Sequence, residues 1–232
     1  MADASAASGP VSVSVSKNLA RDLPRRTRVP TQVFLLSPAS CGGRRAALLF
    51  GGRGTFPLAE RLRAGEAVAL GEAFSFLSGL YFRGKLAYAE AFAAPPPGVA
   101  PTYIITTNRG LLEPGAPVSA ADLRAFAEVD IDASDPRYRQ PLLQAARAIG
   151  ERLADETHVV LLGSIASGKY VDVLSEVFGA RLRFPIEFVG RGDMSRGGLL
   201  LRCVDAQREL MYVPIVGTAR RGARPPRLEP RG

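Results

Sequence analysis

The sequence predicts an α/β protein of three layers, with a mainly parallel central sheet and an antiparallel C-terminal extension. Three observations predict this class. Short apolar runs alternate with segments of helical spacing over most of the chain. Three of these runs end in loops rich in Gly, Ser or Thr, as strands do at the ligand-binding edge of such sheets. After Arg181 the runs follow one another without helices, which indicates antiparallel pairing.

The length of 232 residues favours a single domain. We expect this domain to cover residues 31–216, between flexible tails at 1–30 and 217–232. No apolar run is long enough to span a bilayer, and the N-terminal stretch lacks a basic flank followed by an apolar block. The sequence therefore predicts a cytoplasmic protein without a membrane partner. Cys41 and Cys203 lie far apart, with no metal-ligand spacing, so we expect neither a metal nor another cofactor.

The net charge of +8 comes mostly from the two tails. Residues 1–30 carry five basic and two acidic side chains, and residues 217–232 carry five basic and one acidic, which leaves +1 for the rest. Both tails are rich in Pro, Gly, Ser or Ala and lack apolar periodicity. Weak, non-specific contact with nucleic acid through the tails is therefore one interpretation, and a solubilising role is the other.

Strands are expected where β-branched, aromatic or other apolar residues form short runs between turn residues. The first run lies between Pro30 and Pro38, and Pro cannot donate a hydrogen bond to a sheet. Residues 205–208 have the length and composition of a hairpin turn between the last two strands. In order, the expected strands are Thr31–Ser37, Thr102–Thr107, Val159–Gly163, Leu182–Phe188, Leu199–Val204 and Glu209–Val216.

Helices are expected where apolar residues recur at three- and four-residue spacing. Ser119 and Asp122 have the spacing of a capping box, in which the two residues satisfy each other's amides. Asp135 followed by Pro136 is a second start signal. In order, the expected helices are Pro57–Arg63, Glu66–Leu77, Tyr81–Phe92, Ser119 to Val129, Pro136 to Ala154 and Tyr170 to Phe178.

The loop after the third strand reads Gly-Ser-Ile-Ala-Ser-Gly-Lys and precedes a helix. Such a loop is typical of anion binding by backbone amides at a helix N-terminus. A nucleoside triphosphatase also needs a short hydroxyl after the lysine, to bind magnesium, where this chain has Tyr170. We therefore expect anion binding without ATPase chemistry. The candidate ligand-binding residues in this loop are Gly163, Ser164, Ser167, Gly168 and Lys169.

A second loop, Gly190 to Gly198, interleaves glycines with charged residues. Arg191 and Arg196 offer two guanidinium groups for bidentate contact with phosphate or carboxylate. Asp193 is the candidate general acid or base, because no histidine is available. A flexible turn in which Asp193 pairs with Arg191 or Arg196 explains the pattern equally well. The candidate residues are Arg191, Asp193, Ser195 and Arg196.

Two further loops follow strands that we expect to run parallel to the third, so all three loops emerge at one sheet edge. Cys41 in the first of them has no histidine nearby to activate its thiol, and a small buried residue is the favoured interpretation. The candidate ligand-binding residues are Ser37, Cys41 and Arg44 in the first loop and Thr107, Asn108 and Arg109 in the second.

Four stretches carry a resemblance to known proteins: Ser37 to Cys41, Leu80 to Ala89, Ile104 to Leu112 and Val159 to Leu174. They hold a Ser/Cys loop, a Leu-Tyr-Phe-Arg and Ala-Tyr-Ala helix, a Gly-Leu-Leu turn and a Tyr-containing helix. In this layout the chain resembles a bacterial family of unknown function. The wider group is similar to the uracil-DNA-glycosylase-type α/β sheet, also seen in the central domain of archaeosine synthase and in peroxide-stress proteins. The resemblance implies that fold and a nucleobase, nucleotide or nucleic-acid context, and it implies no catalytic residue.

We expect the chain to bind a small anionic ligand, of nucleotide or nucleobase type, where the four loops meet, and either to process it or only to hold it. In this hypothesis Lys169 and Arg196 bind phosphate or carboxylate, and the backbone from Gly163 to Gly168 surrounds the anion. Two other classes stay open: a nucleic-acid-binding module that uses the basic tails, and a non-catalytic scaffold subunit. The residues alone identify no protein partner.

Overall fold

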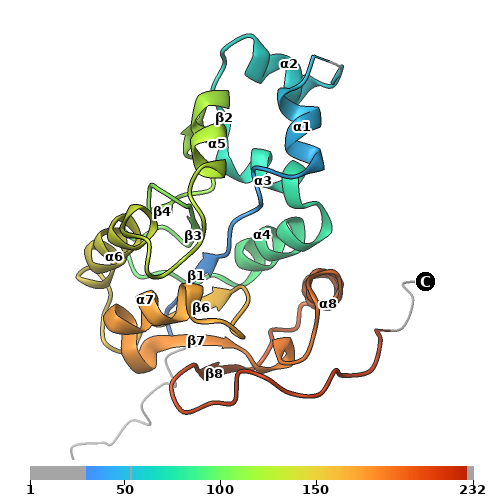
Figure 1. Ribbon diagram of the computed structural model, residues 1–232. Helices are drawn as coiled ribbons and strands as arrows, with labels where there is room; N and C mark the ends of the chain where they lie inside the picture. The colour runs from blue at the N-terminus through green and yellow to red at the C-terminus, as the bar shows by residue number, and fades with distance from the viewer. Residues whose placement is uncertain (1–29, 53, 229–232) are drawn as a thin grey trace, which may run out of the picture.

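This computed structural model describes residues 30–52 and 54–228. The strands of its main sheet are β1 (Gln32–Leu36), β3 (Thr102–Ile105), β4 (Leu111–Leu112), β6 (His158–Leu162), β7 (Leu182–Pro185) and β8 (Tyr212–Pro214). They lie in the order β4-β3-β1-β6-β7-β8 (Figure 1). The four inner strands run parallel, and β4 and β8 run antiparallel at the edges. The predicted α/β class, with its antiparallel C-terminal extension, is confirmed.

β1 lies at the centre of this sheet, between β3 and β6. Leu35 pairs with Tyr103 on one side and with Leu161 on the other, in parallel register. All of β1 is buried, as expected of a parallel strand with helices on both faces. The prediction that the first three apolar runs are parallel neighbours is therefore confirmed.

Alternate residues of β1 face two separate cores, because side chains along a strand point to opposite faces. Phe34 and Leu36 belong to one core, and Val33 and Leu35 belong to the other. Figure 1 shows helices on both sides of the sheet, which gives the three predicted layers. Helices α1 (Arg44–Phe50), α2 (Pro57–Arg63), α3 (Leu70–Ser78), α4 (Leu80–Phe92), α5 (Ala120–Ala127) and α8 (Asp193–Asp205) contribute to the first core, and α6 (Pro136–Gly150) and α7 (Gly168–Phe178) to the second.

Local sequence explains where two of these helices begin. The Ser119 hydroxyl accepts a hydrogen bond from the Asp122 amide, and the Asp122 carboxylate accepts one from the Ser119 amide, so the predicted capping box is confirmed. The Asp135 carboxylate accepts from the amide of Arg137, behind Pro136 at the first position of α6. Of the helices in the part of the chain described here, none has the length and apolarity needed to cross a membrane.

The structure corrects the prediction for the C-terminal third of the chain. Leu199–Val204, predicted as a strand, lies inside helix α8. Gly197, Leu200 and Cys203 are buried at helical spacing, but the pair Gly197 and Gly198 concealed the helix, because glycine has a poor helix propensity. The predicted hairpin is therefore wrong, and β8 pairs with β7 instead.

Several short elements differ from the prediction or were not predicted. The run Glu66–Leu77 contains the short strand β2 (Val68–Ala69) before α3, and β2 pairs antiparallel with β5 (Pro117–Val118). Helix α1 begins at Arg44, within a stretch that the sequence indicated as a loop. The end of Leu182–Phe188 forms a 3-10 turn rather than strand. The strands β2 and β5 and the 3-10 turn are two or three residues long and have no periodicity of their own to detect.

The described part of the C-terminal tail, residues 217–228, has no helix or strand but lies against the domain. The Arg221 guanidinium donates to the Ala166 carbonyl, and the Arg191 guanidinium donates to the Pro226 carbonyl. That this tail is flexible and dispensable for folding stays a prediction. Residues 1–29 of the N-terminal tail and residues 229–232 lie outside the described part of the chain.

Candidate functional site

A cavity of about 870 Å³ lies at the carboxyl edge of the sheet, next to the ends of β1 and β6. From β1 the chain passes to helices on one face, and from β6 it passes to α7 on the other. Open α/β sheets bind ligands at such a switch point, because the two loops leave a crevice between them. The volume is typical of a small-molecule site. The polar and aromatic lining includes Ser37, Tyr81, Thr107, Lys169, Tyr170 and Asp193.

Ser37 lines this cavity and contacts a fully buried lysine behind it. Lys85 Nζ lies 2.9 Å from Ser37 Oγ and also donates to the Ser37 carbonyl oxygen. Lys85 comes from α4, where Tyr81 and Tyr88 share its buried stripe at helical spacing. The Lys85 side chain has no solvent exposure, and a lysine is almost never buried so completely. The pair Ser37 and Lys85 is therefore an unusual feature of this site.

Burial lowers the pKa of Lys85 to about 7, because the ammonium form loses its hydration. The carboxylate of Asp193 raises this pKa, and the guanidinium of Arg196 lowers it further. The rings of Tyr81 and Phe82 lie 4.6 and 4.8 Å from Nζ and favour the cation. With these effects combined, Lys85 exchanges its proton near neutral pH.

Two buried tyrosines contribute phenols to the cavity wall. Tyr170, from α7, lies near enough to Ser37 for that residue to lower its pKa. The Tyr81 hydroxyl has no hydrogen-bond partner of ordinary geometry among residues 30–52 and 54–228, although Arg196 is near enough to lower its pKa. Burial is the larger effect for both groups, and it raises the pKa of Tyr81 and that of Tyr170. Both phenols therefore stay protonated at neutral pH and can donate to a ligand.

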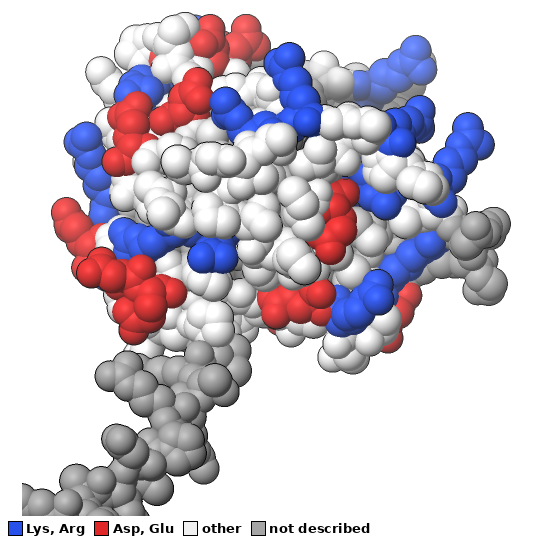
Figure 2. All heavy atoms as spheres, turned by 90° about the horizontal axis from the view of Figure 1, so that it is seen from below, with Lys and Arg blue, Asp and Glu red and all other residues white. Residues whose placement is uncertain are grey.

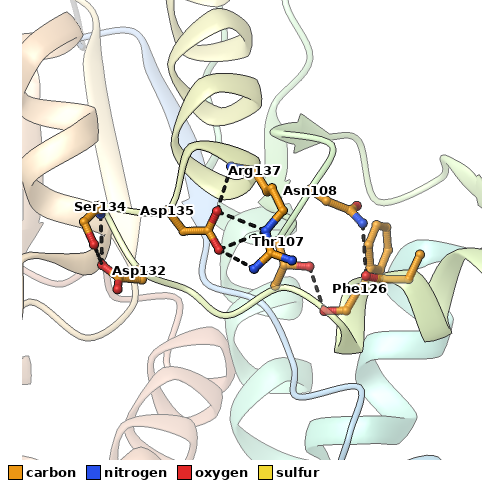
Figure 3. A network of polar contacts seen from close by, with 8 residues as sticks. Thr107, Asn108, Phe126, Asp132, Ser134, Asp135 and Arg137 are labelled. Atoms are coloured by element: carbon orange, nitrogen blue, oxygen red, sulfur yellow. Dashed lines mark hydrogen bonds and ion pairs between the residues drawn. The ribbon is translucent and has the colours of Figure 1, made fainter.

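The loop after β3 is held by the end of α5. Thr107 Oγ1 donates to the Phe126 carbonyl at 2.7 Å, and Asn108 Nδ2 donates to the Ala125 carbonyl at 3.0 Å. Figure 3 shows both side chains directed at this helix end. Of the three predicted residues here, only Thr107 lines the cavity. Arg109 forms an ion pair with Asp122 instead.

The loop after β6 contributes Ser164 and Lys169 to the cavity. A Cβ on Gly163 would lie 2.9 Å from the Cβ of Ser37, closer than side-chain carbons normally approach. Only glycine therefore allows this loop to pass so near to Ser37. The Lys169 ammonium lies 5.1 Å from the centre of the Tyr170 ring. The loop thus places a cation, a hydroxyl and an aromatic ring on one side of the cavity.

The amino end of α7 is already next to a carboxylate. Gly168 lies against the side-chain oxygens of Asp172, and Ser167 is exposed and makes no capping hydrogen bond. A carboxylate at this end repels a second anion. The cradle of backbone amides from Gly163 to Gly168 stays a prediction, and the position of Asp172 disfavours it.

The predicted loop from Gly190 to Gly198 is a loop only at its start, since α8 begins at Asp193. Asp193 lines the cavity with a largely exposed side chain. Arg196 is buried, donates to a backbone carbonyl and lies 3.4 Å from Asp193, so one of the two ion pairs considered from the sequence is present. Arg191 donates to the Ser195 hydroxyl outside the cavity lining.

Cys41 and Arg44 follow β1. Cys41 lines the cavity and is buried, and burial raises its pKa to about 12. Its thiol therefore stays protonated and is a poor nucleophile, in agreement with the expectation of a small buried residue. Arg44 is exposed as the first residue of α1 and is not part of the lining.

The cavity therefore brings together residues from all four predicted loops: Ser37, Cys41, Thr107, Ser164, Lys169 and Asp193. The other predicted residues lie outside its lining: Arg44, Asn108, Arg109, Gly163, Ser167, Gly168, Arg191, Ser195 and Arg196. Sequence reasoning missed Lys85, Tyr81 and Tyr170 as site residues. One signal was present for Lys85, because it lies four residues after Tyr81 and four before Ala89, within the apolar stripe of its helix.

Comparisons of the chain with protein-family models, curated proteins and solved structures gave no match. The resemblance to the uracil-DNA-glycosylase-type group therefore stays a prediction. Within the described residues, no group of three or more His, Cys, Asp or Glu is placed to hold a metal ion.

Proposed function

We propose that the cavity binds a small organic ligand that carries an anionic group, of the size and type of a nucleotide or nucleobase derivative. The observation that carries this proposal is the combination of Lys169 with the phenols of Tyr81 and Tyr170 around one switch-point cavity. An ammonium group attracts phosphate or carboxylate. Aromatic side chains give a flat ring an apolar surface, and their protonated hydroxyls supply donors.

Hydroxyl groups complete the polar lining. Ser37, Thr107 and Ser164 each place a side-chain oxygen near the cavity, and hydroxyls both donate and accept hydrogen bonds. Asp193 offers a carboxylate, which accepts from amino or ring N–H groups of a base. A few polar groups in a partly apolar cleft are what fix the orientation of a small ligand. The lining therefore suits a ligand with an anionic end and a heterocyclic end.

The face of the molecule drawn in Figure 2 gives little support to the alternative of a nucleic-acid-binding module. Figure 2 shows one face of the molecule, on which Lys and Arg side chains are interspersed with Asp and Glu. Nucleic-acid-binding surfaces instead gather basic side chains in a patch or stripe. Of the two basic tails that motivated this alternative, residues 1–29 of the N-terminal one lie outside the described residues, whereas residues 217–228 of the C-terminal one are described.

Calorimetric titration tests the proposal with four probes: a nucleoside 5′-monophosphate, the same nucleoside, inorganic phosphate and a short single-stranded oligonucleotide. We expect the monophosphate to bind, and Lys169→Ala to weaken its binding by about 10-fold, the loss of one charge-assisted hydrogen bond. Binding of the nucleoside should change little in that variant. Arg147→Ala is the matched control, because Arg147 is an exposed cation on α6 and does not line the cavity.

Three results would argue against this function. The first is that none of the probes binds, and the second is that Lys169→Ala binds the monophosphate as tightly as the parent chain. The third is that only an oligonucleotide binds, with an affinity that falls steeply with salt. That third result would favour the nucleic-acid-binding class.

A further inference from the structure

We propose that Ser37 is a nucleophile and Lys85 its general base, and that this pair transfers an acyl group from an ester or thioester to water. This inference rests on the proposed function, because it uses the same cavity to hold the substrate. It goes further, since it assigns a reaction and two catalytic residues.

The geometry matches that of an activated serine. The nucleophile and the base are within hydrogen-bond distance, at 2.9 Å, and Ser37 belongs to the cavity lining while Lys85 does not. The serine is thus between the cavity and the amine, as a nucleophile must be between its substrate and its base. Serine and lysine form catalytic pairs on several unrelated folds, where the lysine replaces histidine. The one histidine of this chain, His158, opens β6 at the opposite end of that strand from the cavity loop.

A lysine acts as a base only when it is neutral, and its surroundings here favour the amine. The groups that face Lys85 are Ser37 from β1, Tyr81 from its own helix, and Asp193 and Arg196 from α8. The position of Arg196 and the complete burial of the amine both oppose the ammonium form, whereas Asp193 supports it. In the neutral form, one N–H still donates to the Ser37 carbonyl oxygen, and the lone pair accepts the Ser37 hydroxyl proton.

The phenols of the cavity are the donors that an oxyanion needs. Tyr170 lies near enough to Ser37 for that residue to lower its pKa, and the Tyr81 hydroxyl is buried without a partner of ordinary geometry in residues 30–52 and 54–228. A buried donor without a partner is costly, so a ligand atom that accepts from it gains the full hydrogen bond. Tyr81 and Tyr170 line the same cavity as Ser37. In this mechanism their phenols stabilise the negative charge that develops on the carbonyl oxygen of the substrate.

The reaction has two balanced steps. Ser37 Oγ bonds to the acyl carbon while its proton moves to Lys85 Nζ, and the carbonyl electron pair moves to oxygen. When that pair returns, the bond to the leaving alkoxide or thiolate breaks, and this group takes the proton from Lys85. In the second step, water attacks the acyl carbon of the acyl-serine and gives a proton to Lys85. The bond from the acyl carbon to Ser37 Oγ then breaks, the acid is released, and Ser37 Oγ takes back its proton from Lys85.

The substrate class follows from the leaving group and from Lys169. An alkoxide or a thiolate is a better leaving group than the nitrogen of an amide and does not need to be protonated before its bond breaks. Esters and thioesters therefore suit a base that is neutral near pH 7 and returns its proton only as the leaving group departs. Lys169, on the other side of the lining, attracts a phosphate or carboxylate elsewhere in the same molecule. We therefore expect an acyl ester or thioester that also carries an anionic group.

The experiment uses a fluorophosphonate, a general probe of activated serines, with the full-length chain between pH 6 and 9. Peptide mass spectrometry should locate the label on Ser37, and the labelling rate should rise with pH as Lys85 loses its proton. Ser37→Ala should abolish this label, and Lys85→Met should slow it by roughly 100-fold or more. Ser175→Ala is the matched control, because Ser175 lies on α7 outside the cavity lining and should leave labelling unchanged.

Circular dichroism establishes that each variant is folded, and Lys85→Arg serves as a second variant, since it keeps a cation but cannot act as a base. The proposal is overturned if the folded parent chain shows no label on Ser37, or if folded Lys85→Arg or Lys85→Met labels as fast as the parent. The ligand titration separates this failure from that of the proposed function. If the monophosphate binds but Ser37 is not labelled, the proposed acyl transfer is wrong and the proposed ligand class stands. If Ser37 is labelled but the monophosphate does not bind, the proposed ligand class is wrong and the acyl transfer stands.

Discussion

Gly84 of α4 and Gly197 of α8 lie against each other where the two helices cross. A Cβ built on Gly84 would be 2.8 Å from the Gly197 carbonyl oxygen, and one built on Gly197 would be 2.8 Å from the Cα of Tyr81. Neither glycine leaves room for a side chain. Because Lys85 follows Gly84 and Arg196 precedes Gly197, this crossing also sets the electrostatic surroundings of the buried amine.

Gly197→Ala should destabilise the fold. The added methyl group would meet backbone atoms that cannot rotate away, so the helices must separate, and such overpacking costs about 1–3 kcal/mol. Urea denaturation followed by circular dichroism measures this loss. We also expect the separation to change the labelling of Ser37, because α4 holds Lys85.

Gly198→Ala is the matched control for that variant. A Cβ on Gly198 would meet only a side-chain carbon of Leu228, at 3.6 Å, which is ordinary contact. Replacing glycine by alanine inside a helix then raises the free energy of unfolding by roughly 0.5–1 kcal/mol. Equal effects at positions 197 and 198 would contradict a specific close contact between α4 and α8.

Lys85 should make stability depend on pH just above neutrality. Its pKa falls from an ordinary value of 10.5 to about 7 on folding, so between these values the unfolded chain binds more protons than the folded one. The free energy of unfolding therefore rises with pH above about 7, by at most about 1.4 kcal/mol per pH unit. Denaturation at several pH values between 6.5 and 8.5 measures this slope.

Lys85→Met isolates the contribution of that one group. The free energy of unfolding of this variant, relative to that of the parent, should be highest at pH 6.5, where the parent carries a buried ammonium. This difference should become smaller as the pH rises. Cys41 titrates above this window, because its ordinary pKa of 9.0 rises to about 12 on folding, so it contributes little to the difference. A difference that stays constant with pH would show that Lys85 does not titrate in the folded chain in this window.

Ser119→Ala should destabilise the fold by about 1 kcal/mol, because it removes the hydroxyl of the capping box at the start of α5. Ser167→Ala offers a comparison at the same position of another helix. Ser167 precedes α7 but makes no capping hydrogen bond, so its loss should change the free energy of unfolding by less than about 0.5 kcal/mol. Thermal unfolding of both variants tests whether the hydrogen bond, rather than the residue type, stabilises the helix.

Removal of residues 217–232 should lower the thermal midpoint by about 2–4 °C, which corresponds to about 1 kcal/mol for a domain of this size. The deletion removes the hydrogen bonds of Arg221 to Ala166 and of Pro226 to Arg191. Arg221→Ala alone should account for part of the fall. An unchanged midpoint would instead support the sequence-based expectation that this tail is dispensable.

Local patterns in the sequence are enough to predict the centre of the sheet and its binding edge. The runs that became β1, β3 and β6 are almost continuously apolar, as is typical of strands covered on both faces, and this pattern is local. The capping residues Ser119 and Asp135 act on amides two or three residues away. Because parallel strands place their following loops at one edge, the convergence of Ser37, Thr107 and Lys169 could be predicted without a structure.

Other features of the fold and of the site depend on contacts between segments that lie far apart in the sequence. Residues 193–205 form helix α8 although glycine has a low helix propensity. The close contact of Gly197 with α4 favours the helix there, and this contact is not visible in the local sequence. Lys85 and Ser37 lie 48 positions apart, and nothing in the residues around either one indicates the other. Their contact, and the pKa that follows from it, arises because β1 ends where the buried face of α4 crosses α8, and long-range packing rather than local periodicity sets that position.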